Sequence, residues 1–165
     1  MAYTIGIALF VQGCPFKCHN CFNPETWDFN GGKEWNEEVE NQFIELAKRP
    51  YIKRVSILGG EPLADENRQD VLNLVNKIRL LLPDKTIWLY SGYTWEECLI
   101  KPKTCEENIF RALRYEVLKQ CDVFVDGRYV EKQKDITLKW AGSRNQRVID
   151  VKETLKQNKV VLYTQ

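Results

Sequence analysis

The chain has 165 residues, which is the size of one ordinary domain, and we expect a single domain over residues 1–165. Hydrophobic residues make up 44% of it and charged residues 28%, so a core can form and a disordered chain is disfavoured. Because 24 Lys and Arg face 23 Asp and Glu, the net charge of +1 supplies no general attraction to nucleic acid or to an anionic membrane.

Two further observations predict a cytoplasmic protein. The longest purely apolar stretch, residues 7–11, is far shorter than the roughly 20 residues that cross a bilayer. The N-terminus has no basic segment ahead of an apolar one, so no signal peptide is expected. Since the cytosol keeps thiols reduced, the six cysteines favour a metal site with bystanders over a set of disulfides.

Strand and helix patterns alternate along the chain. In chain order, we expect a strand at 5–11, a helix at 36–48, a strand at 54–58, a helix at 67–82, a strand at 86–90, a helix at 106–119 and a strand at 123–125. Asn36 is placed to cap the first helix, and Pro83 to end the second. The C-terminal part predicts strands at 147–151 and 160–164 around a short helix rich in Lys and Glu.

This repetition implies parallel strands joined by right-handed crossovers, a sheet that binds ligands at the carboxyl ends of its strands. Four segments follow strand ends and should gather there: the loop 13–33, Gly-Gly-Glu-Pro at 59–62, Ser-Gly-Tyr-Thr at 91–94 and Asp-Gly-Arg at 126–128. A closed barrel of this kind takes about 250 residues. We therefore predict an α/β fold, an incomplete TIM-like barrel of parallel strands with crossover helices and an open side.

Three of the cysteines, Cys14, Cys18 and Cys21, fall within eight residues of the first long loop. A structural zinc site takes four protein ligands, and the neighbouring His19 is poorly placed to be the fourth. A four-iron cluster normally takes four cysteines, so three would leave one iron open to a substrate. A structural zinc loop or unrelated buried thiols are the plainer alternatives. The other cysteines are expected to be small core residues: Cys98, Cys105 and Cys121.

The spacing Cys14-x-x-x-Cys18-x-x-Cys21, followed by Gly59-Gly60-Glu61-Pro62, resembles the radical S-adenosylmethionine enzymes. Segments at 13–23, 90–97, 125–128 and 142–147 resemble more narrowly the glycyl-radical activases of anaerobic ribonucleoside-triphosphate reductases. The resemblance implies a fold of the radical S-adenosylmethionine type. It also implies that the three cysteines hold a [4Fe–4S] cluster whose open iron binds S-adenosylmethionine.

The implied activity is reductive cleavage of S-adenosylmethionine to methionine and a 5′-deoxyadenosyl radical. That radical removes a hydrogen atom from a glycine Cα of the large reductase subunit, and the electron comes from a small donor such as reduced flavodoxin. No catalytic side chain beyond the cofactor ligands is implied, and no nucleic-acid or membrane partner is expected.

The resemblance places the S-adenosylmethionine contacts in the cysteine loop and at two strand ends: Asn20, Cys21, Phe22, Gly59, Gly60, Glu61, Ser91, Gly92 and Tyr93. The wider superfamily has an aromatic residue just before the third cysteine, where this chain has Asn20, and the aromatic Phe22 follows instead. Weaker candidates for the rim of the site or for partner contacts are Asp126, Arg128, Asn145 and Arg147.

Two other functions stay open. One is a different radical S-adenosylmethionine enzyme, either a pyruvate formate-lyase-type activase or an enzyme of a small molecule. The other is a non-catalytic iron–sulfur or zinc binding module. The segment Ser143–Arg147 favours the reductase as partner.

Overall fold

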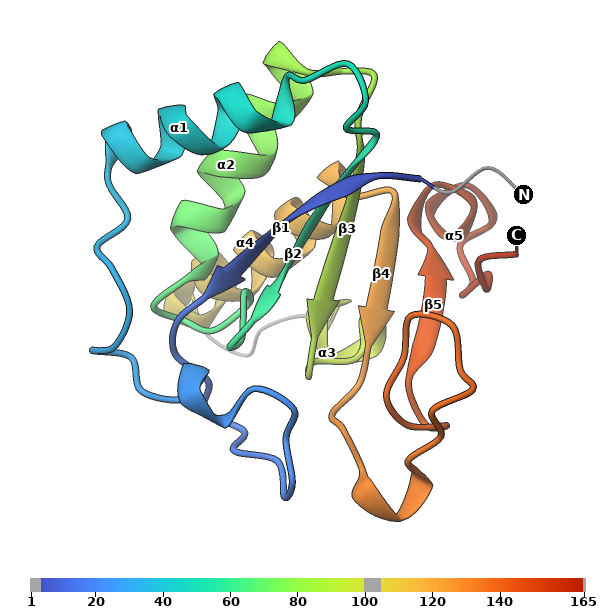
Figure 1. The fold of residues 1–165 in the computed structure, drawn as a ribbon. Helices are drawn as coiled ribbons and strands as arrows, with labels where there is room; N and C mark the ends of the chain where they lie inside the picture. The colour runs from blue at the N-terminus through green and yellow to red at the C-terminus, as the bar shows by residue number, and fades with distance from the viewer. Residues whose placement is uncertain (1–3, 100–104, 165) are drawn as a thin grey trace.

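A computed structural model describes residues 4–99 and 105–164, with the side chains of 105–111 left out. The chain forms a five-stranded sheet in the order β1-β2-β3-β4-β5 (Figure 1). The strands are Gly6–Val11, Arg54–Gly59, Thr86–Ser91, Val123–Asp126 and Arg147–Asp150. The helices are Glu37–Ala47 (α1), Arg68–Leu81 (α2), Trp95–Leu99 (α3), Cys105–Gln120 (α4) and Val151–Gln157 (α5), with 3-10 turns at Pro24–Thr26 and Glu131–Gln133.

Strands β1 to β4 pair in parallel, as the alternation of strands and helices predicted. The expectation of parallel pairing is wrong for β5, which runs antiparallel to β4. Residues 127–146 join these two strands with only a 3-10 turn and no crossover helix, so the chain re-enters the sheet from the end at which it left. The expected strand at 160–164 is reduced to an isolated bridge between Ile149 and Leu162.

The sheet stays open, because β1 and β5 lie at its two edges. This agrees with the predicted incomplete barrel in one respect, the open side. None of the helices in the described part of the chain is both long and apolar enough to span a membrane.

The two faces of the sheet carry different layers. Alternate strand residues such as Val55, Ile57 and Phe124 are fully buried against α1, α2 and α4 in the main hydrophobic cluster. On the opposite face, Trp88 packs with Val123 in a smaller cluster that the chain after β4 covers in part. The carboxyl ends of β1 to β4 therefore open on one edge between these layers (Figure 1).

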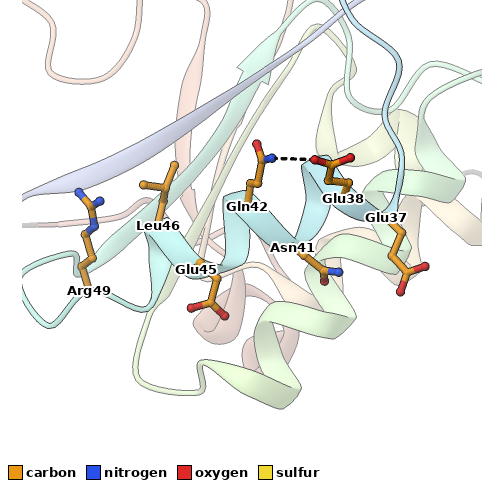
Figure 2. Close-up of a pocket in the computed structure, with 7 residues that line it drawn as sticks. All are labelled: Glu37, Glu38, Asn41, Gln42, Glu45, Leu46 and Arg49. Carbon is orange, nitrogen blue, oxygen red and sulfur yellow. Dashed lines mark hydrogen bonds between the residues drawn. The ribbon is translucent and has the colours of Figure 1, made fainter.

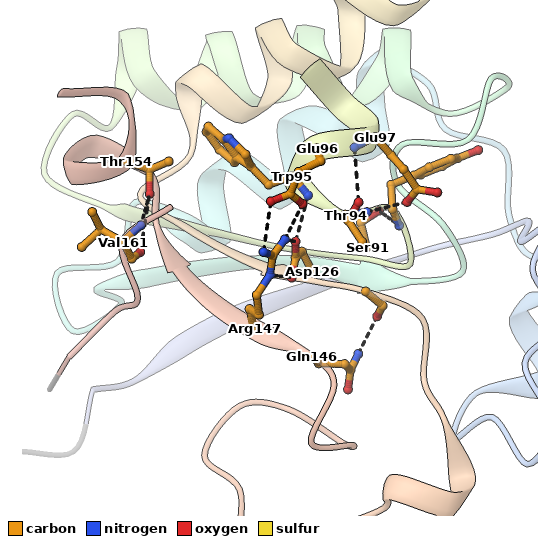
Figure 3. Close-up of polar contacts among 12 residues, drawn as sticks. Ser91, Thr94, Trp95, Glu96, Glu97, Asp126, Gln146, Arg147, Thr154 and Val161 are labelled. Atoms are coloured by element: carbon orange, nitrogen blue, oxygen red, sulfur yellow. Dashed lines mark hydrogen bonds and ion pairs between the residues drawn. The ribbon is translucent and has the colours of Figure 1, made fainter. Parts of the chain in front are cut away.

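The first helix begins as predicted, because the Asn36 side chain accepts a hydrogen bond from the Val39 amide at 3.0 Å. The short helix α3 was not expected. A capping box forms its start: the Glu97 amide donates to Thr94 Oγ1 at 3.2 Å, and the Thr94 amide donates to the Glu97 carboxylate at 2.7 Å (Figure 3).

A buried carboxylate joins the ends of β2 and β3. Glu61 is 1% exposed, and it accepts hydrogen bonds from Ser91 Oγ at 2.7 Å, from the Leu63 amide at 2.8 Å and from the Gly92 amide at 2.7 Å. Burial raises the pKa of Glu61 to about 7, while these hydrogen bonds and the charge of Arg114 act to lower it.

A second buried carboxylate fixes α3 and β5 to the end of β4. Asp126 is 1% exposed and accepts hydrogen bonds from the Trp95 amide at 2.8 Å and from Arg147 Nε at 3.0 Å. The Arg147 guanidinium also binds both carboxylate oxygens of Glu96, at 3.1 and 2.6 Å (Figure 3). Asp126 and Arg147 therefore hold three elements together.

Replacing Asp126 by Ala leaves the Trp95 amide without its buried acceptor and Arg147 with one carboxylate fewer. We expect the free energy of unfolding to fall by about 3 kcal/mol. The matched control is Glu45→Ala, which removes an exposed ion pair with Lys48 and should cost less than about 0.5 kcal/mol. Urea unfolding of the three proteins measures both differences, and equal losses in the two variants would contradict this role of Asp126.

The raised pKa of Glu61 predicts how stability changes with pH. Between the ordinary pKa of 4.5 and about 7, the folded protein binds a proton that the unfolded chain has released. The free energy of unfolding should therefore fall as the pH rises through this window, on the order of 3 kcal/mol from this group. Glu61→Gln removes the titration, so its stability should decline less than that of the unmodified protein between pH 5 and 7.5. Urea unfolding across this range tests the prediction, and parallel curves would refute it.

Candidate functional site

The four segments that follow β1 to β4 meet as predicted and line one cavity of about 240 Å³. All three clustered cysteines are part of its wall. The Gly59–Glu61 turn, the Ser91–Gly92 end of β3 and the start of the chain after β4 complete it. The carboxyl ends of four adjacent parallel strands therefore converge on the cysteine loop.

The cysteine loop is attached to the sheet through backbone hydrogen bonds. The Gly13 amide donates to the Thr26 carbonyl at 2.8 Å and the Cys14 amide to the Trp27 carbonyl at 3.1 Å, which closes the loop on itself. The Glu61 amide donates to the Gly13 carbonyl at 2.7 Å, which joins the loop to the end of β2. These bonds set the position of the loop without using any of its side chains.

Two glycines make this close approach of β1 and β2 fit sterically. A Cβ at Gly60 would lie 2.4 Å from the Gly13 carbonyl oxygen, and a Cβ at Gly59 would lie 2.8 Å from backbone atoms of Phe10 and Val11. Gly59 also has a φ of +110°, a backbone angle that residues other than glycine rarely adopt. The Gly-Gly sequence is thus required by the distance between the two backbones.

All three loop cysteines are free thiols and only partly buried. Lys17 and Asn20 have positive φ of 44° and 52°, which turns the chain between successive cysteines so that all three reach the same cavity. Burial raises the pKa of the Cys14 and Cys18 thiols, and nearby backbone amides act to lower it. Amides directed at sulfur suit a site that holds thiolates.

The chain between β4 and β5 packs on the other side of the cysteine loop. The Phe22 ring lies 5.1 Å from the Tyr129 ring, and a Cβ at Gly142 would lie 2.9 Å from Phe22. The Glu131 carboxylate accepts a hydrogen bond from the Asn20 side chain and bonds His19 Nδ1 at 2.7 Å. Residues 127–146 thus close the cavity from the side of β4.

Of the predicted S-adenosylmethionine contacts, Asn20 and Tyr93 do not line the cavity. The Asn20 side chain donates a hydrogen bond to Glu131. The Tyr93 ring packs against Arg114, whose guanidinium carbon lies 3.8 Å from the ring centroid. The other predicted contacts do line it: Cys21, Phe22, Gly59, Gly60, Glu61, Ser91 and Gly92. The Glu61 carboxylate accepts hydrogen bonds from Ser91 and Gly92. Its main effect on the cavity is therefore to stabilise the turn that forms part of the wall.

The four weaker candidates line an adjoining hollow at the ends of β3 and β4 and the start of β5, and of these four only Arg128 also lines the cysteine cavity. Several wall residues are not among the predicted contacts: Trp27, Leu58, Tyr90, Tyr129 and Trp140. Leu58 and Tyr90 could have been found, since they directly precede the selected strand ends. Trp140 comes from the middle of a long irregular loop and has no local signal.

Two predicted core cysteines, Cys98 and Cys121, are buried and lie outside the cavity. The side chain of Cys105 lies outside the described residues. Within residues 4–99 and 112–164, no three His, Cys, Asp or Glu side chains are grouped as they would be around a single metal ion. In a four-iron cluster each thiolate binds its own iron, so the three sulfur atoms need not meet at one point.

A further hollow of about 800 Å³ lies on the outer face of α1 and shares no residue with the cysteine cavity (Figure 2). Three carboxylates, from Glu37, Glu38 and Glu45, stand along it, and Gln42 donates a hydrogen bond to Glu38 at 3.4 Å. It is an acidic helix surface without buried polar groups directed into it.

Comparisons with known proteins agree with this geometry. A family model described as "4Fe-4S single cluster domain" matches residues 5–149. A protein of Vibrio cholerae is 38% identical over 140 residues, which cover 84% of this chain and 83% of the relative. A protein of Escherichia coli is 37% identical over the same shares, and one of Enterobacteria phage T4 is 34% identical over 86% of this chain and 81% of its own. No solved structure matches the chain.

All three relatives carry the name anaerobic ribonucleoside-triphosphate reductase-activating protein. The relatives match over most of both chains, and the family model covers the cysteine loop, β1 to β4 and most of β5. The resemblance seen in the cysteine spacing and the strand-end segments is thereby confirmed. The chain belongs to the 4Fe-4S single cluster domain family and, within it, to the anaerobic ribonucleoside-triphosphate reductase-activating proteins.

Proposed function

We propose that this protein is a radical S-adenosylmethionine oxidoreductase that activates an anaerobic ribonucleoside-triphosphate reductase by forming a glycyl radical on its large subunit. The observation that carries the proposal is the shared cavity: the three loop cysteines line the same space as the Gly59-Gly60 turn. The names of the relatives support the reductase as the partner. We further propose that residues 1–165 act as one domain in the cytoplasm, with reduced flavodoxin or a similar small protein as electron donor.

The side chains around the cavity suit a [4Fe–4S] cluster with one open iron. Three thiols without disulfide partners are the sulfur ligands that such a cluster takes. Trp27 lines the same cavity, and its indole N–H is buried with no hydrogen-bond acceptor among the described residues. A buried N–H group normally has a hydrogen-bond acceptor. A sulfur atom of the cluster or the carboxylate of S-adenosylmethionine would provide one for Trp27.

When bound, the cluster and S-adenosylmethionine supply one-electron reductive cleavage of the sulfonium and hydrogen-atom abstraction from a glycine Cα. Cys14, Cys18 and Cys21 would hold the cluster. The backbone of the Gly59-Gly60 turn, which lines the cavity, would meet the methionine end of the substrate. Apolar wall residues such as Tyr90 and Trp140 would exclude water from the reacting atoms.

The cavity of about 240 Å³ is smaller than the roughly 300–1,000 Å³ usual for small-molecule sites. We therefore propose that the surrounding loops move outward when both groups bind. The hydrogen bond from the Glu61 amide to the Gly13 carbonyl holds one wall in place, so we expect residues 127–146 to be the part that moves.

Removing one cluster ligand should abolish the chemistry. Cys18→Ala leaves two thiols in the loop, so we expect it to lose the cluster and to form no 5′-deoxyadenosine. Cys121→Ala is the matched control, because Cys121 is buried and lies outside the cavity. This variant should retain the cluster and should still form 5′-deoxyadenosine.

The measurement is anaerobic iron–sulfur reconstitution, iron analysis, and chromatography for 5′-deoxyadenosine after dithionite reduction with S-adenosylmethionine. Cleavage retained by Cys18→Ala would refute the ligand assignment. A folded, cluster-loaded protein that makes no product, with or without the reductase, would favour the binding module. A glycyl radical signal after mixing with the reductase distinguishes this activase from other radical S-adenosylmethionine enzymes.

The Gly-Gly turn predicts a second result. In Gly60→Ala the new methyl group meets the Gly13 carbonyl, which belongs to the backbone and cannot turn aside. The turn and the cysteine loop must separate, and we expect the rate of S-adenosylmethionine cleavage to fall more than about tenfold. In Gly31→Ala the nearest atom is the end of the flexible Gln12 side chain, so this control should keep its rate. Equal rates in the two variants would contradict the steric argument.

A further inference from the structure

Arg128 follows the end of β4, and its guanidinium lies against the cysteine loop. The guanidinium carbon is 4.2 Å from the centroid of the Phe16 ring, well inside the range of a cation–π contact. Phe16 stands between Cys14 and Cys18 in the sequence. Through this ring, Arg128 contacts the segment that joins two of the predicted cluster ligands.

The Phe16 ring is enclosed on its other sides as well. The Tyr93 ring meets it edge-on with centroids 4.8 Å apart, and the Arg114 guanidinium covers Tyr93 at 3.8 Å. A Cβ at Gly92 would lie 2.4 Å from the Phe16 ring and 3.3 Å from Arg128 Cγ. Phe16 therefore occupies a space that the bare Gly92 backbone provides and that Arg128 closes.

The backbone around Arg128 is held in position. Its carbonyl accepts a hydrogen bond from Asn145 Nδ2 at 2.8 Å, and the Gly127 carbonyl accepts one from Gln146 Nε2 at 2.9 Å. Gly127 has φ of +98°, which allows the chain to turn away from β4 at this point. The location of the guanidinium is thus set by two residues just before β5 as well as by the ring that it covers.

The charge of Arg128 is only weakly neutralised. Within the described residues its ion-pair partner is Glu97, at 3.7 Å, and both side chains are partly exposed. Burial raises the pKa of the Cys18 thiol, and the charge of Arg128 acts in the opposite direction. Arg128 and Cys18 line the same cavity, so the guanidinium places a positive charge in the wall that carries this thiol.

We propose that Arg128 is a positioning residue of the cluster site, which clamps the cysteine loop through Phe16 and keeps a positive charge in the wall of the cavity that the three cysteines line. The inference rests on the proposed function. An iron–sulfur centre becomes more negative when it takes up an electron, so a nearby cation stabilises its reduced form. Arg128 thereby makes uptake of the electron that cleaves S-adenosylmethionine more favourable.

Three variants and one control separate charge from packing. Arg128→Gln removes the charge, Arg128→Lys keeps it without the planar group, and Phe16→Leu removes the ring. The control is Arg144→Gln, because Arg144 belongs to the same connection but pairs with Asp135 at 2.9 Å and does not line the cavity.

The charge is tested by redox titration of the reconstituted proteins followed by electron paramagnetic resonance. In Arg128→Gln we expect the equilibrium constant for reduction to fall about tenfold, which is ~59 mV for a one-electron couple. Arg128→Lys should shift the potential by less than half as much, and Arg144→Gln should leave it unchanged.

The clamp is tested on the protein before reconstitution, with a protease that cleaves after lysine. Lys17 lies next to Phe16, so cleavage at Lys17 reports how often the loop leaves its place. We expect faster cleavage there in Arg128→Gln and in Phe16→Leu, by a few-fold, and no change in Arg144→Gln.

An Arg128→Gln protein with unchanged potential and unchanged cleavage at Lys17 overturns the proposal and leaves Arg128 as a surface residue available to a partner. If the unmodified protein takes up no cluster, the proposed function fails. The cleavage rates then decide on their own whether Arg128 clamps the loop.

Discussion

The contact between two backbones, at the ends of β1 and β2, determines where the cysteine loop lies. Gly60 donates to the Val11 carbonyl at 2.8 Å, Glu61 donates to the Gly13 carbonyl at 2.7 Å, and no side chain fits between these segments. The start of the cysteine loop is therefore fixed relative to the end of β2. The loop lies opposite the ends of β3 and β4. The remaining contacts of the site act on a loop that this junction has already placed.

Two buried carboxylates extend this arrangement across the sheet. Glu61 links the ends of β2 and β3, and Asp126 links β4 to α3 and β5. Glu61 accepts hydrogen bonds from the Leu63 and Gly92 amides and Asp126 accepts one from the Trp95 amide, which offsets the cost of burying each carboxylate. The two differ in their partners, since a guanidinium binds Asp126 directly whereas Glu61 receives bonds from neutral groups. The hydrogen bonds from these neutral groups do not offset the effect of burial on Glu61, which raises its pKa to about 7.

The sequence predicted the parts of this arrangement that arise from local patterns. Alternation of strands and helices gave β1 to β4, and the cysteine spacing together with Gly59-Gly60 indicated the strand ends that line the cavity. The capping box at Thr94 and Glu97 is a sequence signal for the start of α3, although the prediction from the sequence did not include this helix. The direction of β5 was not predictable from the residues of that strand, because the missing crossover helix decides it. The orientation of Asn20 depends on Glu131, 111 residues further along the chain, and no local pattern encodes such a contact.

The two walls of the cavity differ in what it costs to separate them from the cysteine loop. On the side of β2, the contacts are hydrogen bonds between two backbones that lie too close together for a side chain to fit between them. On the side of β4, they are side-chain contacts such as His19 with Glu131, whose side chains are 83% and 41% exposed, and exposed pairs of this kind contribute at most about 1 kcal/mol. Arg128 on Phe16 is the contact on this side that reaches between the cysteines themselves. The wall formed by residues 127–146 is therefore the one that separates from the cysteine loop at the lower cost, while the start of the loop stays bonded to the end of β2.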